Sequence, residues 1–380
     1  MAMAITGGLS ITGGMNLFMP NYIPPPPPQL TRLYTWGFNP YGALGQNDAV
    51  SRSSPTQVGS GTTWSLVSIG WYNTIATKTD GTLWTWGKND YGQLGTNDTV
   101  NKSGPAQLGA LTTWSQVSTN AYSTAAIKTD GTLWTWGNNY YGGLGQNDTV
   151  RRSSPTQVGS ATNWSLVSVG QYSSMATRTD GTLWTWGRNN YGALGLGDTV
   201  DRSSPTQVGV ATNWSLVSAG QYSSMATRTD GTLWTWGQNN NGQLGTNDTV
   251  HRSSPTQVGS ATTWSRVSIG PYNTVATRTD GTLWTWGYNR YGQLGTNDTV
   301  HRSSPTQVGV ATTWSLVSAG QYSTIAIKTD GTLWSWGQNN YGQLGFNDTV
   351  RRSSPTQVGS ATNWSLVSIN SYNGMAITTN

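Results

Sequence analysis

The chain contains no cysteine and no glutamate, and only two of its 380 residues are histidine. Without cysteine there are neither disulfides nor thiolate ligands and nucleophiles, so stability must come from packing. Acid–base or triad chemistry would have to rely on His251 or His301, which stand at equivalent positions fifty residues apart. We interpret them as alternative choices at one loop position. We therefore expect no enzymatic activity, no metal site and no cofactor.

Charged residues are also scarce, at 9% of the chain, and no apolar run approaches the roughly 20 residues of a membrane-spanning helix. The net charge of +5 is scattered rather than gathered in a basic run. We interpret it as a contribution to solubility and regard nucleic acid as an improbable partner. The start of the chain lacks the positive charge of a secretory signal, so we expect no export by that route.

Glycine and tryptophan are abundant instead, with 48 and 21 residues. The stretch "TDGTLWTWG" at 79–87 returns every 50 residues up to 329, with one Thr→Ser change in the last copy. Seven such units follow one another from Thr31 to Asn380 without an insertion. A fixed period of this length is typical of a repeat architecture.

Each unit is predicted to hold four short strands. Residues 63–70, 72–79 and 81–87 are rich in Thr, Val, Ile and Trp, and Asp80-Gly81 between the last two predicts a two-residue hairpin turn. A fourth strand is predicted at 54–59, where Pro55 favours a sheet edge. Four antiparallel strands per unit indicate a propeller blade.

The two chain ends predict that the propeller is closed. Asn380 falls at the position of Asp80, so the last unit lacks its final strand, whereas residues 31–37, "TRLYTWG", are an extra copy of that strand. We expect the N-terminal strand to complete the C-terminal blade, because a closed ring leaves no exposed sheet edge. The predicted fold is all-β: a seven-bladed propeller over residues 31–380, preceded by an extended arm over residues 1–30.

The stretch "GWYNTIATKTDGTLWTWGKNDYGQLG" (70–95) resembles the repeat of the regulator of chromosome condensation family, and the resemblance recurs in all seven units. It implies a seven-bladed β-propeller. Founding members of that family promote nucleotide exchange on a small GTPase through a wedge that protrudes from one blade. This chain has no insertion for a wedge, and it has Asn73 and its equivalents where the family often has histidine.

Two features that are constant in the repeat, its tryptophans and its loop aspartates, can each be interpreted as structural or as functional. Trp84 and Trp86 lie on one side of their strand, where blades must pack together, so we expect these rings and the Trp64 type to be buried rather than to form a stacking platform. Asp98 and its equivalents, in "NDT" or "GDT", could suggest calcium, but one carboxylate per loop favours a turn-forming role. The glycosylation sequons at Asn97 and its equivalents are treated as incidental.

Positions that differ between units are candidates for recognition. They follow the "WG" of each unit, lie in the next loop, or stand at the place of Trp71, which is aromatic in no other unit. A propeller face with such diverse loops could bind a partner, although exposed loops also drift. The candidate residues are Phe38, Trp71, Lys88, Tyr140, Arg151, Arg188, His251, Tyr288, Arg290, His301 and Arg351.

The first thirty residues differ from all that follows. They carry no charged side chain, and five consecutive prolines at 24–28 predict an extended spacer. Such an uncharged tail is poorly solvated, so we expect it to dock on a partner. The pattern resembles N-terminal arms of structural proteins in tailed bacteriophages, particularly cyanophages. The expected docking residues are Ile5, Leu9, Ile11, Leu17, Phe18 and Met19.

Together these features suggest a non-enzymatic virion protein, located on the particle, in which the arm holds a propeller on a capsid or tail protein. The propeller would decorate the particle or contact a host surface protein or glycan. Two alternatives stay open. One is a soluble protein-interaction propeller of the nucleotide-exchange-factor type, and the other is a sugar-binding lectin that uses Trp71.

Overall fold

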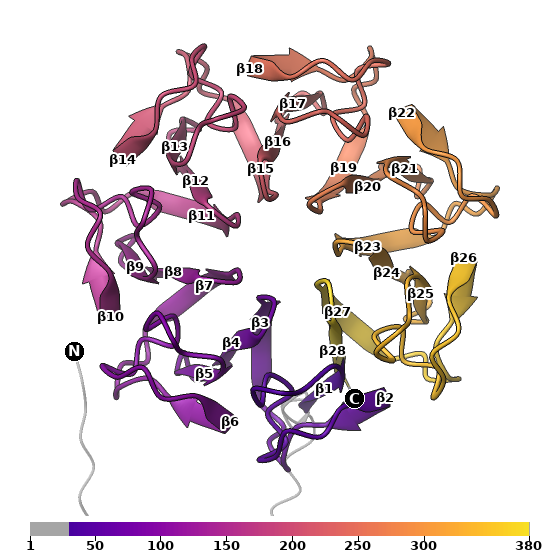
Figure 1. Ribbon diagram of the computed structural model, residues 1–380, viewed down its shortest axis with the longest axis horizontal. Helices are drawn as coiled ribbons and strands as arrows, with labels where there is room; N and C mark the ends of the chain where they lie inside the picture. Colours follow the sequence, from indigo (N-terminus) through magenta and orange to yellow (C-terminus); the bar gives the residue numbers. More distant parts are fainter. Residues whose placement is uncertain (1–29, 380) are drawn as a thin grey trace, which may run out of the picture.

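The computed structural model describes residues 30–379, which form seven four-stranded antiparallel sheets arranged as blades around one axis (Figure 1). Every strand recurs at the fifty-residue period seen in the sequence. Each sheet runs from a strand beside the axis to a strand on the outer wall. The predicted all-β seven-bladed propeller is therefore confirmed.

The strands of the seven blades have closely similar bounds. The innermost strands are β3 (Trp64–Ile69), β7 (Trp114–Thr119), β11 (Trp164–Val169), β15 (Trp214–Ala219), β19 (Trp264–Ile269), β23 (Trp314–Ala319) and β27 (Trp364–Ile369). The second strands are β4 (Asn73–Lys78), β8 (Ser123–Lys128), β12 (Ser173–Arg178), β16 (Ser223–Arg228), β20 (Asn273–Arg278), β24 (Ser323–Lys328) and β28 (Asn373–Thr379). The third strands are β5 (Leu83–Gly87), β9 (Leu133–Gly137), β13 (Leu183–Gly187), β17 (Leu233–Gly237), β21 (Leu283–Gly287), β25 (Leu333–Gly337) and β1 (Thr31–Gly37). The outermost strands are β6 (Lys102–Gln107), β10 (Arg152–Gln157), β14 (Arg202–Gln207), β18 (Arg252–Gln257), β22 (Arg302–Gln307), β26 (Arg352–Gln357) and β2 (Arg52–Gln57).

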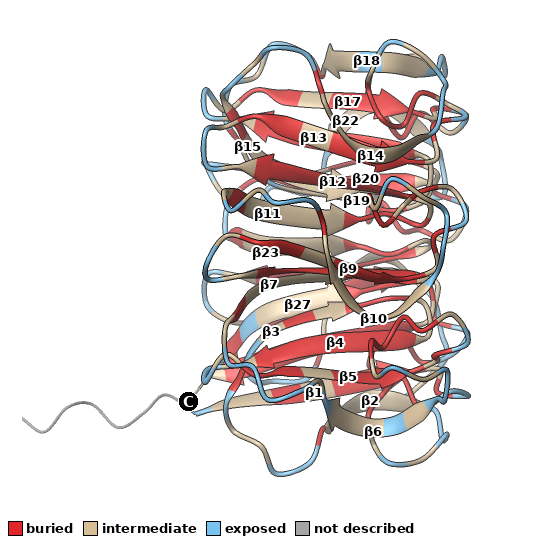
Figure 2. Ribbon diagram, turned by 90° about the vertical axis from the view of Figure 1, so that its left-hand side faces the viewer, coloured by how far each residue is buried: buried red, intermediate tan, exposed pale blue. Residues whose placement is uncertain are grey.

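The burial of the strands follows their place in the blade. The second strands are the most buried, because both of their faces are covered by neighbouring blades, and the exposed residues gather in the loops at the two ends (Figure 2). The outermost strands are half-buried and carry the proline, as predicted for Pro55, which thus needs no ladder partner on its outer side.

The hairpin between the second and third strands is longer than predicted. Lys78 and Thr82 are joined by a backbone hydrogen bond of 3.0 Å, which leaves three residues in the turn rather than two. Only Gly81 of these has a positive φ, of 77°. A two-residue type I′ turn would need a positive φ at Asp80 as well. Asp80 instead accepts hydrogen bonds from the backbone N–H and the hydroxyl of Thr82.

The ring is closed within one blade, as predicted. Strand β1 pairs with β28 along its whole length, with Leu33 opposite Ile377 and Thr31 opposite Thr379. The closing blade contains a second N-terminal strand as well, because β2 forms its outer edge. Two strands from each end of the chain therefore make up this blade, whereas the sequence predicted a single N-terminal contribution. Strand β28 accordingly lies beside β1 (Figure 1).

Tryptophan links each blade to the one before it. Trp86 is fully buried, and its indole nitrogen donates a hydrogen bond of 2.9 Å to the carbonyl oxygen of Ala43 in the preceding blade. Trp64 is also buried, and its ring meets that of Trp86 edge to face at 5.8 Å. Trp84 does not fit the prediction of complete burial: it is half-buried, and the Lys78 ammonium covers one face of its ring at 3.9 Å.

The arm predicted at residues 1–30 lies, except for its last residue, outside the described residues. The docking residues Ile5, Leu9, Ile11, Leu17, Phe18 and Met19 all lie there, so their predicted role stays a prediction. Within residues 30–379, no helix is long and apolar enough to cross a membrane.

Candidate functional site

One face of the propeller carries two concentric sets of tyrosines, which we call the tyrosine crown. This face is formed by the loops that join first to second strands and third to fourth strands. The inner set, at the ends of the first strands, comprises Tyr72, Tyr122, Tyr172, Tyr222, Tyr272, Tyr322 and Tyr372. The outer set, in the longer loops, comprises Tyr41, Tyr91, Tyr141, Tyr191, Tyr291 and Tyr341, with Asn241 at the remaining position.

Ring contacts run through both sets. In the inner set, Tyr72 stacks on Tyr372 with ring centroids 5.2 Å apart, and Tyr172 stacks on Tyr222 at 5.5 Å. Each outer ring meets an inner ring edge to face, as Tyr41 meets Tyr72 at 5.1 Å. These are favourable aromatic geometries, so the crown is a rigid surface rather than a set of mobile side chains.

The hydroxyls of Tyr172 and Tyr322 in the inner set stay protonated at physiological pH. Burial raises the pKa of Tyr172 to about 12, together with the proximity of Tyr222 and Tyr122. Burial likewise raises the pKa of Tyr322 to about 12. Gln171 donates a hydrogen bond of 3.0 Å to the Tyr172 hydroxyl. These two residues therefore present neutral phenols that can both donate and accept hydrogen bonds.

Two of the predicted binding residues, Lys88 and Arg188, place their positive charges over rings of the crown. The Lys88 ammonium is 4.8 Å from the Tyr41 ring centroid and also pairs with Asp90 at 3.1 Å. The Arg188 guanidinium lies 4.4 Å from the Tyr141 ring and within 5.5 Å of the inner rings of Tyr172 and Tyr222. Cation–π contacts of this kind hold the charge on the aromatic surface.

Several of the predicted residues occupy one equivalent loop position, where the side chain either accepts a hydrogen bond from the backbone or contacts a tyrosine ring. At this position His251 Nδ1 accepts a hydrogen bond of 3.0 Å from the Asn239 backbone, and His301 Nδ1 accepts one of 2.9 Å from Asn289. Ser51, Asn101 and Asp201 accept the equivalent bond in their own blades. Part of the variation at this position is thus an exchange of one hydrogen-bond acceptor for another, each of which fixes the loop.

Arginine at this loop position cannot act as an acceptor, and its contacts differ accordingly. The Arg151 guanidinium lies 4.8 Å from the Tyr91 ring of the neighbouring blade, and Arg351 lies 5.9 Å from Tyr291. His251 also reaches an outer ring, that of Tyr191, at 5.2 Å. These side chains connect the crown to the loops around it.

The aromatic candidates extend the crown at both rims. Phe38 packs 4.7 Å from the outer ring of Tyr341, and Tyr288 packs 6.0 Å from the inner ring of Tyr272. Trp71 lies between two inner tyrosines and lines a central cavity of about 140 Å³. Tyr140 is the most exposed of them, at 70%.

The charge of this face is positive. Five variable positions carry a cation, and two carry a carboxylate, Asp90 and Asp201. The five cations are Lys88, Arg151, Arg188, Arg290 and Arg351, of which Arg151, Arg290 and Arg351 are exposed. By contrast, the constant loop carboxylates are balanced by a cation four residues later, as Asp48 is by Arg52 at 2.7 Å. The excess of cations on this face therefore comes from the variable residues.

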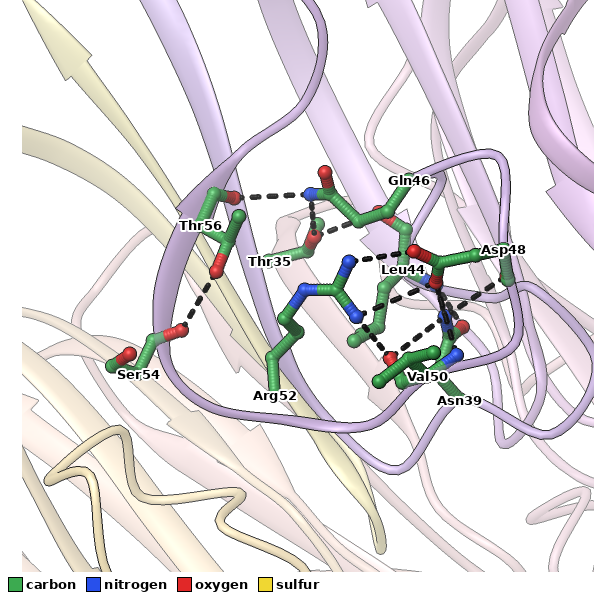
Figure 3. A network of polar contacts seen from close by, with 9 residues as sticks. All are labelled: Thr35, Asn39, Leu44, Gln46, Asp48, Val50, Arg52, Ser54 and Thr56. Carbon is green, nitrogen blue, oxygen red and sulfur yellow. Dashed lines mark hydrogen bonds and ion pairs between the residues drawn. The ribbon is translucent and has the colours of Figure 1, made fainter.

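The constant part of each long loop is a scaffold for the crown (Figure 3). Asp48 Oδ1 accepts the backbone N–H of Val50, while its other oxygen accepts from Arg52. The Asn39 side chain donates to Asp48 and accepts from the Leu44 backbone. The turn-forming role predicted for these aspartates is confirmed, since each carboxylate is engaged within its own loop.

The sequence prediction missed the tyrosines themselves. Nine of the eleven predicted residues contact a crown tyrosine, and His301 accepts a hydrogen bond within its own loop. The criterion for predicting them was variation, however, and the tyrosines scarcely vary between units. Their signal was a second period-50 pattern: Tyr72 recurs in every unit directly after the variable position of Trp71, and Tyr41 recurs in six. A constant aromatic residue in a loop is therefore as informative as a variable one.

Comparison with known proteins identifies the repeats. A family model described as the RCC1-like domain matches residues 29–268, and a model of the regulator of chromosome condensation (RCC1) repeat matches 280–327 and 330–377. Among curated protein sequences, none matches the chain.

Solved structures share the fold. Human WBSCR16 is 21% identical, with a TM-score of 0.82 over 92% of this chain and 98% of that one. Prp20p from Saccharomyces cerevisiae, described with its binding to Gsp1p and histones, is 18% identical, with a TM-score of 0.81 over 92% of both chains. Since the RCC1-like domain model alone matches more than half of its residues, the chain belongs to the family of RCC1-like propellers.

Proposed function

We propose that this protein is a non-enzymatic binding propeller that docks a partner protein on its tyrosine crown. The observation that supports this proposal is that the variable side chains gather on one surface of constant aromatic residues. Tyrosine, tryptophan and arginine are the residues most enriched in the energetic centres of protein interfaces, and rigid rings lose little entropy on binding. The loops of the opposite face also vary between units, as Ser160 and Val210 show at one equivalent position, but they exchange uncharged side chains and carry none of the variable cations.

The charge of the crown favours an acidic partner surface. Cations outnumber carboxylates five to two at the variable positions, which would steer an acidic partner and repel a basic one. Prp20p binds Gsp1p and histones, so another RCC1-like propeller serves as a docking surface for proteins. This supports the protein-interaction role over sugar binding through Trp71, whose ring is half-buried among tyrosines.

Photocrosslinking in the cell of origin tests the proposal. A photoactivatable amino acid in place of Tyr140, which is 70% exposed on the crown, is expected to give one dominant protein adduct. The same replacement at Val210, which is 94% exposed on the opposite face, is the control and should give none. Equal adducts at both positions, or crosslinking to nucleic acid, would contradict a protein-binding crown.

Attachment to a virion stays a prediction from residues 1–30. Its test is deletion of these residues followed by sedimentation of assembled particles. If the arm tethers the propeller, the truncated protein will be found folded in the supernatant; if the truncated protein still sediments with particles, the tether does not exist. The crosslinking result on the crown does not depend on this outcome.

A further inference from the structure

Three consecutive blades carry equivalent cavities on the outer wall, away from the tyrosine crown. Their volumes are about 390, 440 and 650 Å³, and they are lined in turn by Arg178, Arg228 and Arg278 with two tryptophans each. Each cavity lies between two blades, because its lining combines residues of one blade with a loop of the preceding blade. Cavities of this size accommodate small ligands.

In each cavity the Nε atom of the arginine lacks a hydrogen-bond acceptor in the part of the chain that the structure describes. The Arg178 guanidinium is stacked 4.0 Å from the Trp184 ring and 4.5 Å from the Trp164 ring. Within residues 30–379 its buried Nε atom has no hydrogen-bond partner, and the same holds for Arg228 and Arg278. Burial lowers the pKa of Arg178, because it removes water from the charged guanidinium.

The remaining lining offers further donors and apolar surface. The indole nitrogen of Trp164 has no acceptor among the described residues, although that side chain is only 3% exposed. The indole nitrogen of Trp184 is already used, because it donates to the Thr182 hydroxyl. Val158 and Pro205 provide the apolar part of the wall. An incoming ligand therefore meets hydrogen-bond donors, one fixed positive charge and flat apolar rings.

The nearby carboxylates do not neutralise this arginine. Asp180 is two residues away and acts on Arg178 through space, but its Oδ1 accepts both the backbone N–H and the hydroxyl of Thr182. Asp148 in the loop of the preceding blade is paired with Arg152 at 2.6 Å. The guanidinium is thus free to bind an added anion.

We propose that these three cavities bind carboxylated sugar units of an acidic polysaccharide. A planar guanidinium matches a carboxylate with two parallel hydrogen bonds, and indole and proline surfaces suit the apolar face of a sugar ring. Three equivalent sites on successive blades, each with one arginine and two tryptophans, fit a ligand that is itself built from repeated units. Binding of one unit raises the effective concentration of the next, so a polymer would bind far more tightly than a monosaccharide.

Titration calorimetry of the full 380-residue chain with polygalacturonate tests this proposal. The triple variant Arg178→Gln, Arg228→Gln, Arg278→Gln should bind on the order of tenfold or more weakly, because all three guanidinium sites are lost. The matched control is Lys78→Gln, Lys128→Gln, Lys328→Gln, which removes equal charge from equivalent positions in three other blades. It should change affinity by less than about twofold, since an ammonium lacks the planar fork.

Several results would overturn the proposal. These are absence of binding to polygalacturonate, equal losses in both triple variants, and equally tight binding of dextran sulfate or polyphosphate, which would show attraction to any polyanion. A third variant, Arg178→Lys, Arg228→Lys, Arg278→Lys, keeps the charge and should still bind weakly; full affinity would rule out guanidinium recognition. Unchanged melting temperatures of the variants show that affinity, not folding, was altered.

Discussion

The indole nitrogen of Trp36 donates a hydrogen bond of 2.8 Å to the backbone carbonyl of Gln343, 307 residues away along the chain. The equivalent bond at an internal junction, from Trp186 to Gly143, is 2.9 Å long and spans 43 residues. The closing junction is therefore made by the same contact as the others. The stability of a propeller that closes in this way should depend on its first strand as much as on any internal strand.

This equivalence predicts equal effects of matched core substitutions. Leu33 in β1 and Leu183 in β13 are both fully buried between blades. Replacement of either by alanine should lower the free energy of unfolding by about 2–5 kcal/mol, because a cavity remains. Urea unfolding followed by tryptophan fluorescence measures both values. A much smaller loss for Leu33→Ala would show that β1 is not built into the closing blade.

A pair of glycines tests how closely the blades approach. Gly81 and Gly59 both have a positive φ, of 77° and 56°, so alanine is strained at either position by about 1–2 kcal/mol. A Cβ at Gly81 would stand 2.1 Å from the backbone oxygen of Thr112, whereas nothing lies within 4 Å of one at Gly59. Gly81→Ala should therefore destabilise the protein clearly more than Gly59→Ala. Equal shifts in thermal midpoint would contradict the close contact.

Periodicity made most of the fold predictable. The fifty-residue repeat predicted the number of blades, and the edge proline Pro55 predicted the outer strand. The extra strand at 31–37 predicted the closure of the ring. All three features follow from the order of residues in the sequence. The turn at Asp80 was missed by one residue because its carboxylate caps Thr82, a side-chain choice that the Asp-Gly signal does not contain.

The site was less predictable for a related reason. Variation between the units indicated Arg151 and Arg188 as candidate binding residues. The tyrosine surface under their side chains, however, depends on which loops of neighbouring blades meet. The order of residues in the sequence does not show which loops meet. The wall cavities were missed because their defining feature is that, among residues 30–379, the Arg178 Nε atom has no hydrogen-bond acceptor. Absence of an acceptor is visible only after the whole neighbourhood is assembled.

The sequon asparagines have a conformational role that the array itself demonstrates. Asn97 has a φ of 60°, and five equivalent asparagines share this left-handed conformation, while Gly197 takes the place in one blade with a φ of 84°. Asn97→Ala should cost about 1 kcal/mol of stability and Asn97→Gly clearly less, because glycine adopts this conformation freely. Differential scanning calorimetry of both variants checks the order. The reverse order would disprove a backbone role.

Acid sensitivity should come from the hairpin aspartates. Hydrogen bonds from the Thr82 hydroxyl and backbone hold the pKa of Asp80 below its usual value of 3.8, and five equivalent hairpins repeat this arrangement. The native state then binds fewer protons than the unfolded state, so stability rises with pH in this range. The contribution is complete above the unfolded pKa and is lost as pH falls through the folded one. Urea midpoints should be level from about pH 5 to 7 and fall below about pH 4.

Replacing these six carboxylates by amides separates titration from geometry. Asparagine keeps the Oδ1 acceptor that binds Thr82 but cannot be protonated in this range. The sixfold variant Asp80→Asn, Asp130→Asn, Asp180→Asn, Asp230→Asn, Asp280→Asn, Asp330→Asn should therefore retain more of its stability between pH 4 and 2 than the parent chain, when each is compared with its own value at pH 7. The loop carboxylates of the Asp48 type remain in both proteins, so some acid sensitivity will persist. Identical pH profiles of the two proteins would mean that the hairpin carboxylates gain nothing from their hydrogen bonds in the folded state.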